Sequence, residues 1–137
     1  MFLFDPVFGE KLSEVLREKQ NLAFYYKKLL LIVKKEVDKE QINCIIEEEL
    51  KHVNIIKNMI VKMFEGQIPS ENKGNLDKGI QSKLLEKIIY LEIKVIRTIK
   101  EILTSVQDIR IKNGMYYILA DDQRHIDTIV FLYSKYT

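Results

Sequence analysis

Residues 45–56 read IIEEELKHVNII, and the apolar and polar residues of this stretch follow a helical spacing. Its helical row consists of Ile45, Glu49, His52 and Ile56, which recur at intervals of three or four residues. Residues at that spacing share one face of an α-helix, so an acid and a histidine lie together among apolar side chains. Because residues i and i+3 are neighbours on a helix, this acid and this histidine can bind one metal ion together.

A second stretch repeats the pattern. Residues 118–129 read ILADDQRHIDTI, with Asp122 and His125 in the positions between the isoleucines. The two stretches contain both histidines of the chain. Acids are 20 of the 137 residues, so chance would place an acid three residues before both histidines with a probability of only about 0.02. The doubled row therefore predicts two similar helices that serve one site.

A glutamate on an apolar row precedes each pair of acid and histidine. Glu18 lies 31 residues before Glu49, and Glu92 lies 30 residues before Asp122. One glutamate from each of two helices, with an acid-x-x-His pair from each of the other two, is the ligand set of dimetal centres in four-helix bundles. Carboxylates with imidazole suit iron, manganese or zinc, whereas four buried acids without a metal would repel one another. The predicted metal ligands are Glu18, Glu49, His52, Glu92, Asp122 and His125.

Helical periodicity extends over the rest of the chain, and helix-breaking residues are few, with two Pro and five Gly. We expect four helices separated by turn residues and marked by caps. The expected boundaries are a start at Pro6 with Asp5 as its cap, a tight turn at residues 34–38, a break at residues 65–76, a third helix from about Asp77 to about Val106, and a cap at Asp108 for a fourth helix that runs nearly to the end.

The link at residues 65–76 is long enough to run the length of the bundle. Twelve extended residues reach about 40 Å, and a helix of about 26 residues is about 39 Å long. A bundle whose helices alternate up and down would need only a few of these residues, whereas ferritin-like bundles contain such a crossover. The sequence therefore predicts an all-α, ferritin-like four-helix bundle with a long crossover between its second and third helices, as a single domain over residues 1–137.

The position of the first turn decides how deep Glu18 lies. If the turn were centred near Val37, Glu18 would lie about 10 Å deeper in its helix than Glu49 does in its own. We therefore predict an early turn, with the second helix starting by about Val37. Asp38 and Gln41 also resemble a capping box, which would start that helix slightly later.

Charge and composition limit the partners. Lys and Arg number 22 against 20 Asp and Glu, and this balance is too weak to indicate binding to nucleic acid or to an anionic membrane. The longest aliphatic run has five residues, 29–33, far short of the roughly 20 needed to span a bilayer. Residues 1–9 lack the features of a signal peptide, so we expect a cytoplasmic protein. The single cysteine, Cys44, is expected to be a small buried hydrophobe.

The ligand rows resemble the helix motifs of rubrerythrin-like proteins, which are ferritin-like di-iron carboxylate proteins. The similar stretches are residues 17–25 (REKQNLAFY), 47–52 (EEELKH) and 120–126 (ADDQRHI), for the first, second and fourth helices. The resemblance implies two metal ions, iron in the first place with manganese or zinc as alternatives, bound by the six ligands named above. It also implies that Tyr25 lies near the metals.

By this resemblance, the protein would be an oxidoreductase that reacts with peroxide or dioxygen, as a peroxidase or a ferroxidase. The chain departs from the family pattern because Asp122 is one methylene shorter than the usual glutamate, and because Val95 and Ile99 replace a frequent glutamate and aromatic residue. It has no Cys-x-x-Cys pair, so an external electron donor would be needed. These departures leave open a non-catalytic metal-binding or interaction module, which could form a homodimer, and a metal-free helical adaptor.

Overall fold

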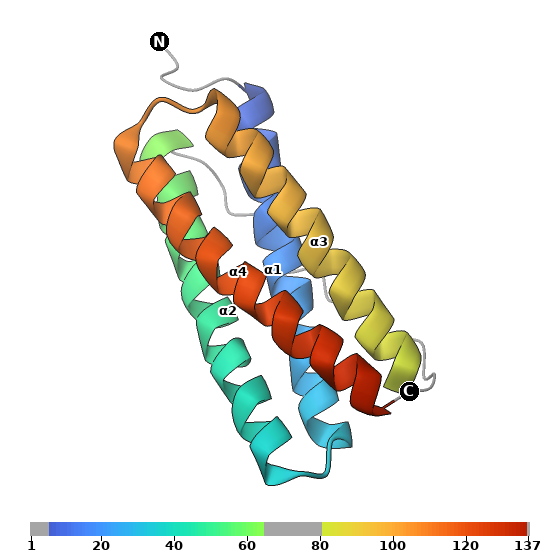
Figure 1. Ribbon diagram of the computed structural model, residues 1–137. Coiled ribbons are helices and arrows are strands. Elements are labelled where there is room, and N and C mark those ends of the chain that lie inside the picture. The colour runs from blue at the N-terminus through green and yellow to red at the C-terminus, as the bar shows by residue number, and fades with distance from the viewer. Residues whose placement is uncertain (1–5, 65–80, 137) are drawn as a thin grey trace.

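The computed structural model describes residues 6–64 and 81–136, and these form four long helices. The helices are α1 (Pro6–Ile32), α2 (Glu36–Phe64), α3 (Gln81–Ser105) and α4 (Ile109–Tyr136). They lie side by side in an elongated bundle (Figure 1). Helix α1 packs against α2 and α3, and α4 packs against the same two helices from the other side. This confirms the predicted all-α four-helix bundle.

The end of α2 and the start of α3 lie at opposite ends of the bundle (Figure 1). The predicted break at residues 65–76, and the expected helix start at Asp77, lie outside the described residues, as does the expected cap Asp5. The long crossover therefore stays a prediction, although the two helix ends that it would join lie far apart.

The second helix starts early, as predicted, because α2 begins at Glu36. The turn between α1 and α2 comprises residues 33–35, which is shorter and earlier than the predicted turn at residues 34–38. The predicted capping box at Asp38 is wrong, because Asp38 already lies in the first turn of α2. Its buried carboxylate accepts hydrogen bonds from the Tyr136 hydroxyl at 2.7 Å and from Lys135 Nζ at 3.0 Å. Asp38 therefore links the start of α2 to the end of α4.

The turn between α3 and α4 has the predicted cap. Asp108 Oδ1 accepts hydrogen bonds from the backbone N–H groups of Arg110, at 2.8 Å, and Ile111, at 3.4 Å. These donors belong to the first turn of α4 and have no partner within the helix. The end of α3 at Ser105 lies within one residue of the prediction.

The core contains the apolar rows of all four helices, and α2 and α4 approach each other closely at Gly114. A Cβ atom at Gly114 would overlap the terminal methyl group of Met59 and would lie 3.6 Å from Ile55. This close approach explains a glycine inside α4. The expected burial of Cys44 is wrong, because this residue is exposed on the outer side of α2.

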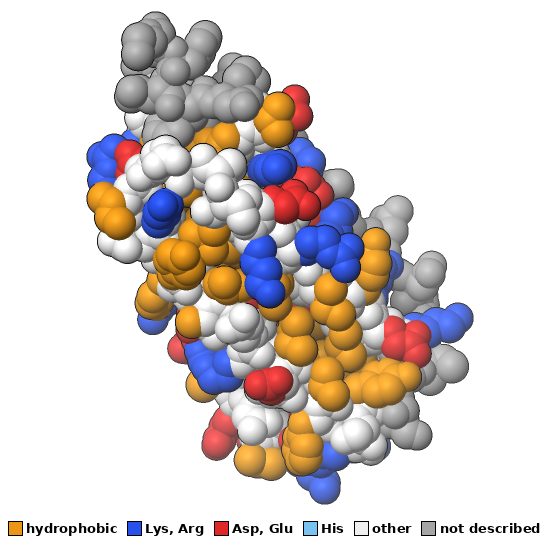
Figure 2. Space-filling model, turned by 45° about the horizontal axis from the view of Figure 1, so that its top comes forward, with side chains coloured by type: hydrophobic (Ala, Val, Ile, Leu, Met, Phe, Trp, Pro, Cys, Tyr) orange, Lys and Arg blue, Asp and Glu red, His pale blue; other side chains and the backbone are white. Residues whose placement is uncertain are grey.

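The face of the molecule in Figure 2 mixes charged side chains with apolar ones. On α4, Tyr116 is 58% exposed and Phe131 is 56% exposed. Across the described ranges, 6–64 and 81–136, none of the helices has the length and apolar character needed to pass through a lipid bilayer.

Candidate metal centre

Four polar side chains, one from each helix, lie at the same level in the middle of the bundle. They are Lys19, Glu49, Glu92 and Asp122, and all are fully buried. Their common level follows from the turns, which are centred at residues 34 and 107. Each of the four residues is 15 positions from its turn, since 34 − 19, 49 − 34, 107 − 92 and 122 − 107 all equal 15. At equal rise per residue, equal distance along the chain gives equal depth.

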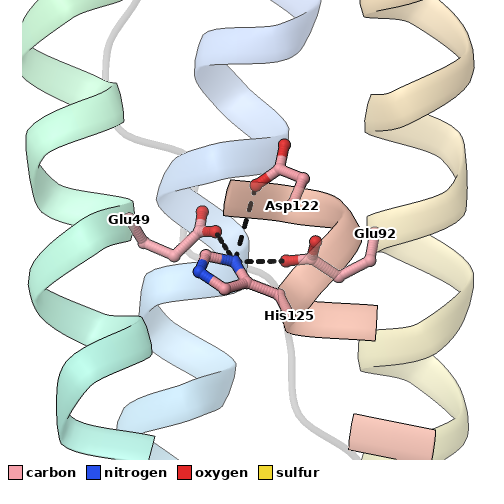
Figure 3. Close-up of side chains that lie close together, drawn as sticks. All are labelled: Glu49, Glu92, Asp122 and His125. Atoms are coloured by element: carbon pink, nitrogen blue, oxygen red, sulfur yellow. Dashed lines mark ion pairs between the residues drawn. The ribbon is translucent and has the colours of Figure 1, made fainter. Parts of the chain in front are cut away.

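Four of the six predicted ligands form one compact group. Each of Glu49, Glu92, Asp122 and His125 offers a ligand atom within 4.8 Å of the others. Figure 3 shows the three carboxylates directed at the imidazole ring. Nδ1 of His125 is 3.0 Å from Glu49 Oε1, 3.5 Å from Asp122 Oδ1 and 3.8 Å from Glu92 Oε1. The shorter side chain of Asp122 therefore still reaches the group.

The donor atoms of this group fit a metal ion. One oxygen of each carboxylate (Glu49 Oε2, Glu92 Oε2 and Asp122 Oδ2) is buried and has no hydrogen-bond partner among residues 6–64 and 81–136. A buried polar atom without a partner costs free energy, so such atoms need an explanation. Carboxylate oxygens with an imidazole nitrogen are suitable ligands for iron, manganese or zinc. The chemistry of the donors and their burial thus agree with the predicted metal site.

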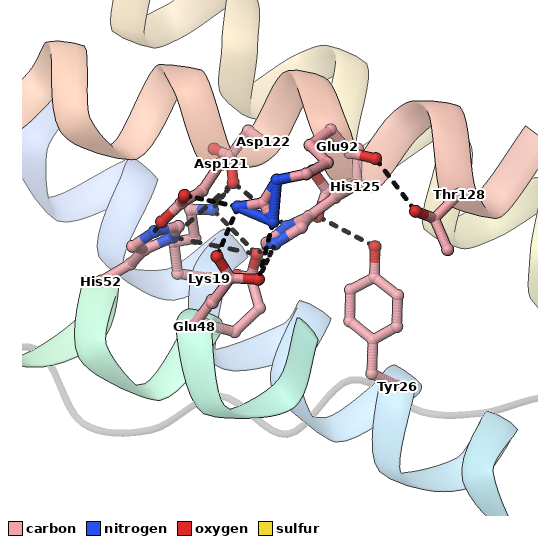
Figure 4. Close-up of polar contacts among 11 residues, drawn as sticks. Lys19, Tyr26, Glu48, His52, Glu92, Asp121, Asp122, His125 and Thr128 are labelled. Atoms are coloured by element: carbon pink, nitrogen blue, oxygen red, sulfur yellow. Dashed lines mark hydrogen bonds and ion pairs between the residues drawn. The ribbon is translucent and has the colours of Figure 1, made fainter. Parts of the chain in front are cut away.

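Both histidine rings are held by an acid on the opposite helix (Figure 4). Nε2 of His52, on α2, lies 2.8 Å from Asp121 Oδ2, on α4. Nε2 of His125, on α4, lies 3.3 Å from Glu48 Oε1, on α2. Metal-binding histidines commonly use one ring nitrogen for the metal and the other for such an acid, which fixes the ring orientation. Each ring therefore has its Nδ1 atom free to face the central group.

The predicted ligand His52 lies beside the compact group. Its Nδ1 atom is 3.6 Å from Asp122 Oδ1 and 3.9 Å from Glu49 Oε1. This nitrogen is buried and has no hydrogen-bond partner in the described part of the chain. His52 thus borders the group beside Asp122 and Glu49.

The predicted ligand Glu18 lies outside the group, and Lys19 is in its place. The Glu18 side chain is 14% exposed, and its Oε1 atom is 3.8 Å from Lys94 Nζ on α3. Lys19 is fully buried and donates hydrogen bonds to Glu49 Oε1, at 3.0 Å, and to Asp122 Oδ1. Neighbouring residues of a helix point about 100° apart, so only one of the two can face the axis of the bundle.

The tyrosine beside the group is Tyr26 rather than the predicted Tyr25. The fully buried Tyr26 hydroxyl donates a hydrogen bond to Glu92 Oε1 at 3.2 Å. Tyr25 faces Lys87, whose Nζ atom lies 5.4 Å from the centre of its ring. On α1 the residues that face the group are therefore Lys19 and Tyr26, each one position after the predicted Glu18 and Tyr25.

The charges of the group depend on one another. Burial lowers the pKa of Lys19, but attraction to Glu49, Asp122 and Glu92 outweighs burial and raises that pKa above its ordinary value. Burial alone would raise the pKa of Glu49, but Lys19 and His125 lower it to about 2. Burial and Glu49 together raise the pKa of Glu92. The ammonium of Lys19 therefore remains charged and compensates the carboxylates around it.

The two histidines differ in charge. Burial lowers the pKa of His52 to about 4, and the nearby Lys19 ammonium acts in the same direction. Burial also disfavours the charged form of His125, but the carboxylates of Glu49 and Glu92, 3.0 Å and 3.8 Å from its Nδ1 atom, favour that form and raise its pKa to about 10. At neutral pH and without metal, His52 is therefore neutral, whereas His125 is protonated on both ring nitrogens and positively charged.

No protein-family model matches the chain, and no curated protein matches it. The resemblance to rubrerythrin-like proteins thus stays a prediction. The case for a metal rests on the buried donor group of Glu49, Glu92, Asp122 and His125.

Proposed function

We propose that this protein binds a divalent transition-metal ion (iron, manganese or zinc) in the middle of the bundle. The observation that carries the proposal is the buried group of three carboxylates and an imidazole, whose ligand atoms lie within 4.8 Å of one another. Burying several acids together is costly unless a cation compensates them. A metal ion would also use the carboxylate oxygens that lack a hydrogen-bond partner within the four described helices and their turns.

The residues that would hold the ion are Glu49, Glu92, Asp122 and His125, the last through Nδ1. Glu48 orients the His125 ring through Nε2, and the surrounding core excludes bulk water. Because the His125 ring is positively charged at neutral pH, metal binding at Nδ1 would release the proton on that nitrogen. We further propose that the ion is iron, which would supply electrons to peroxide or dioxygen. An external donor would then have to restore those electrons.

One observation favours a second candidate, a bundle without turnover that serves as a metal-binding or interaction module. The Lys19 ammonium already lies among the carboxylates and contacts Glu49 and Asp122. It supplies part of the positive charge that a metal would bring, so the bundle can fold without one. The exposed aromatic side chains of α4, Tyr116 and Phe131 among them, would then offer a surface for a partner such as a second copy of the chain.

Metal loading tests the first proposal. The purified protein would be incubated with Fe(II), Mn(II) or Zn(II) without oxygen, desalted, and analysed for metal per chain. We expect retained metal in the native protein and its loss in Glu49→Gln and in Glu92→Gln. Glu47→Gln is the matched control, because Glu47 is an exposed glutamate two positions from Glu49. Equal retention by native protein and Glu49→Gln would contradict a site at this group.

A peroxide assay separates the oxidoreductase from the module. Iron-loaded protein that consumes peroxide faster than the same amount of free iron, with a change in its visible absorption, would support the enzyme. If the protein retains iron but consumes peroxide no faster than free iron, the oxidoreductase reading fails and the metal-binding proposal stands.

A further inference from the structure

The two halves of the chain are related by a shift of 73 residues. The α1–α2 pair and the α3–α4 pair each contain two long helices joined at a three-residue turn. The corresponding positions are the turn centres 34 and 107, Glu48 and Asp121, Glu49 and Asp122, and His52 and His125. The contacts repeat as well, because His52 pairs with Asp121 and His125 pairs with Glu48. The halves therefore form a pseudo-symmetric site rather than a chance cluster.

The same shift places Lys19 opposite Glu92. Position 19 plus 73 is 92, whereas Glu18 corresponds to Leu91. A symmetric centre would have a carboxylate at both equivalent positions, one beside each histidine. Here α3 supplies the carboxylate Glu92 and α1 supplies an ammonium.

The contacts of Lys19, together with the pseudo-symmetry of the two halves, identify the part of the centre that it fills. Its Nζ atom donates hydrogen bonds to Glu49 Oε1 and Asp122 Oδ1. These two oxygens are shared by both halves, because they lie 3.9 Å and 3.6 Å from Nδ1 of His52 and 3.0 Å and 3.5 Å from Nδ1 of His125. The halves are distinguished by Glu92, whose Oε1 atom lies 3.8 Å from Nδ1 of His125. Lys19 occupies the position equivalent to Glu92, and by the pseudo-symmetry that position belongs with His52, where a second cation would share Glu49 and Asp122.

We propose that the Lys19 ammonium takes the second cation position of this centre, so that each chain binds one metal ion, in the half formed by Glu92 and His125. This inference rests on the metal-binding function proposed above. A second divalent ion would lack a carboxylate from α1 and would be repelled by the buried ammonium. The ammonium has three N–H donors, so it can satisfy the two shared carboxylates as a metal ion would.

Replacement of Lys19 by glutamate, the residue at the equivalent position 92, tests the proposal. The native protein, Lys19→Glu and the control Lys94→Glu would be loaded with Mn(II), desalted and analysed for metal per chain. Lys94 undergoes the same change of charge but lies 41% exposed at the surface. We expect one ion in the native protein, two in Lys19→Glu and one in the control. Electron paramagnetic resonance should show isolated Mn(II) in the native protein and a coupled pair in Lys19→Glu.

The outcomes separate this inference from the proposed function. Two ions in the native protein, or one ion in both native protein and Lys19→Glu, would overturn the role of Lys19 and leave metal binding standing. No ion in either protein would overturn both. If Lys19→Glu does not fold, Lys19→Gln takes its place, because it removes the ammonium without adding an acid. It should exceed one ion per chain at Mn(II) concentrations where the native protein stays at one, and a constant value of one would also overturn the proposal.

Discussion

Lys19 Nζ lies 3.0 Å from Glu49 Oε1, and neither side chain is exposed to solvent. A buried ion pair contributes little to stability relative to a well-packed apolar pair, but removal of one partner leaves the other charge buried and uncompensated. Lys19 also contacts Asp122, so its loss would affect two carboxylates. The metal-free fold therefore depends on this ammonium, together with the positive charge of His125.

The first prediction concerns that dependence. Without metal, Lys19→Met should lower the free energy of unfolding by about 3–5 kcal/mol, because buried acids lose their counter-charge. Urea denaturation followed by circular dichroism would measure the change. Lys94→Met is the control, since the Lys94 contacts to Glu14 and Glu18 are partly exposed and such pairs contribute at most about 1 kcal/mol. Equal losses in the two variants would contradict a special role for the buried ammonium.

The second prediction concerns the two tyrosines of α1. Tyr26→Phe removes the hydroxyl that donates to Glu92 Oε1, and we expect a loss of about 1–2 kcal/mol in unfolding free energy because a buried acceptor is left unsatisfied. Tyr25→Phe should change stability by less than about 0.5 kcal/mol, since the hydroxyl of Tyr25 does not reach the group. The same denaturation experiment compares both variants. A larger loss in Tyr25→Phe would mean that the hydroxyl of Tyr25, rather than that of Tyr26, interacts with the group.

The third prediction concerns the ends of α2 and α4 and their response to acid. Burial would raise the pKa of Asp38, but hydrogen bonds from Tyr136 and Lys135 outweigh it and lower the pKa below its ordinary value. A carboxyl whose pKa is lowered in the folded state stabilises the fold above its unfolded pKa. This contribution is lost as pH falls through the folded pKa.

We therefore expect the native protein to lose stability as pH falls below about 4, the ordinary carboxyl pKa, and Asp38→Asn to lose less over the same range. The control is Asp127→Asn, an exposed aspartate of α4, which should follow the native protein. Thermal melting at pH 6, 4 and 3 would measure the three curves. Parallel curves for the native protein and Asp38→Asn would show that this contact does not contribute.

Much of the fold follows from the spacing of apolar residues. The early turn was predictable because it brings the polar residues of the first two helices to similar depth, and the cap at Asp108 because its side chain can accept from the next turn. Asp38 was misread because a capping residue and a buried tertiary acceptor have the same sequence signature. Only the position of Tyr136, 98 residues further along the chain, distinguishes them.

The site was predictable on α2, α3 and α4, where the acid and histidine rows carry the signal. On α1 the prediction named Glu18, because a glutamate next to a lysine suggests the glutamate as ligand and the lysine as a solvated charge. The spacing along the chain favours Lys19 instead as the residue that faces the group. Glu18 lies 31 residues before Glu49, whereas both Lys19 to Glu49 and Glu92 to Asp122 span 30 residues. One residue is a rotation of about 100° on a helix, which is enough to exchange a carboxylate for an ammonium in the core.

The last prediction uses the pseudo-symmetry of the two histidines. Glu48 holds His125 and Asp121 holds His52, at 3.3 Å and 2.8 Å. Loss of an acid that orients a metal-binding histidine typically lowers metal affinity by about 10–100-fold. If the ion binds beside His125, Glu48→Gln should weaken binding by that factor, whereas Asp121→Asn should weaken it by less than about 3-fold, because its histidine lies in the half that Lys19 fills.

Competition with a fluorescent chelator for Zn(II) would measure both affinities, with Glu47→Gln as the control for a loss of charge on α2. Arg124 bridges Glu48 and Asp121, at 2.5 Å and 2.7 Å, so each variant disturbs the same arginine and that effect cancels in the comparison. Equal losses for Glu48→Gln and Asp121→Asn would mean that both histidines bind metal. A larger loss for Asp121→Asn would place the ion beside His52 and would require Lys19 to leave the position that it occupies here.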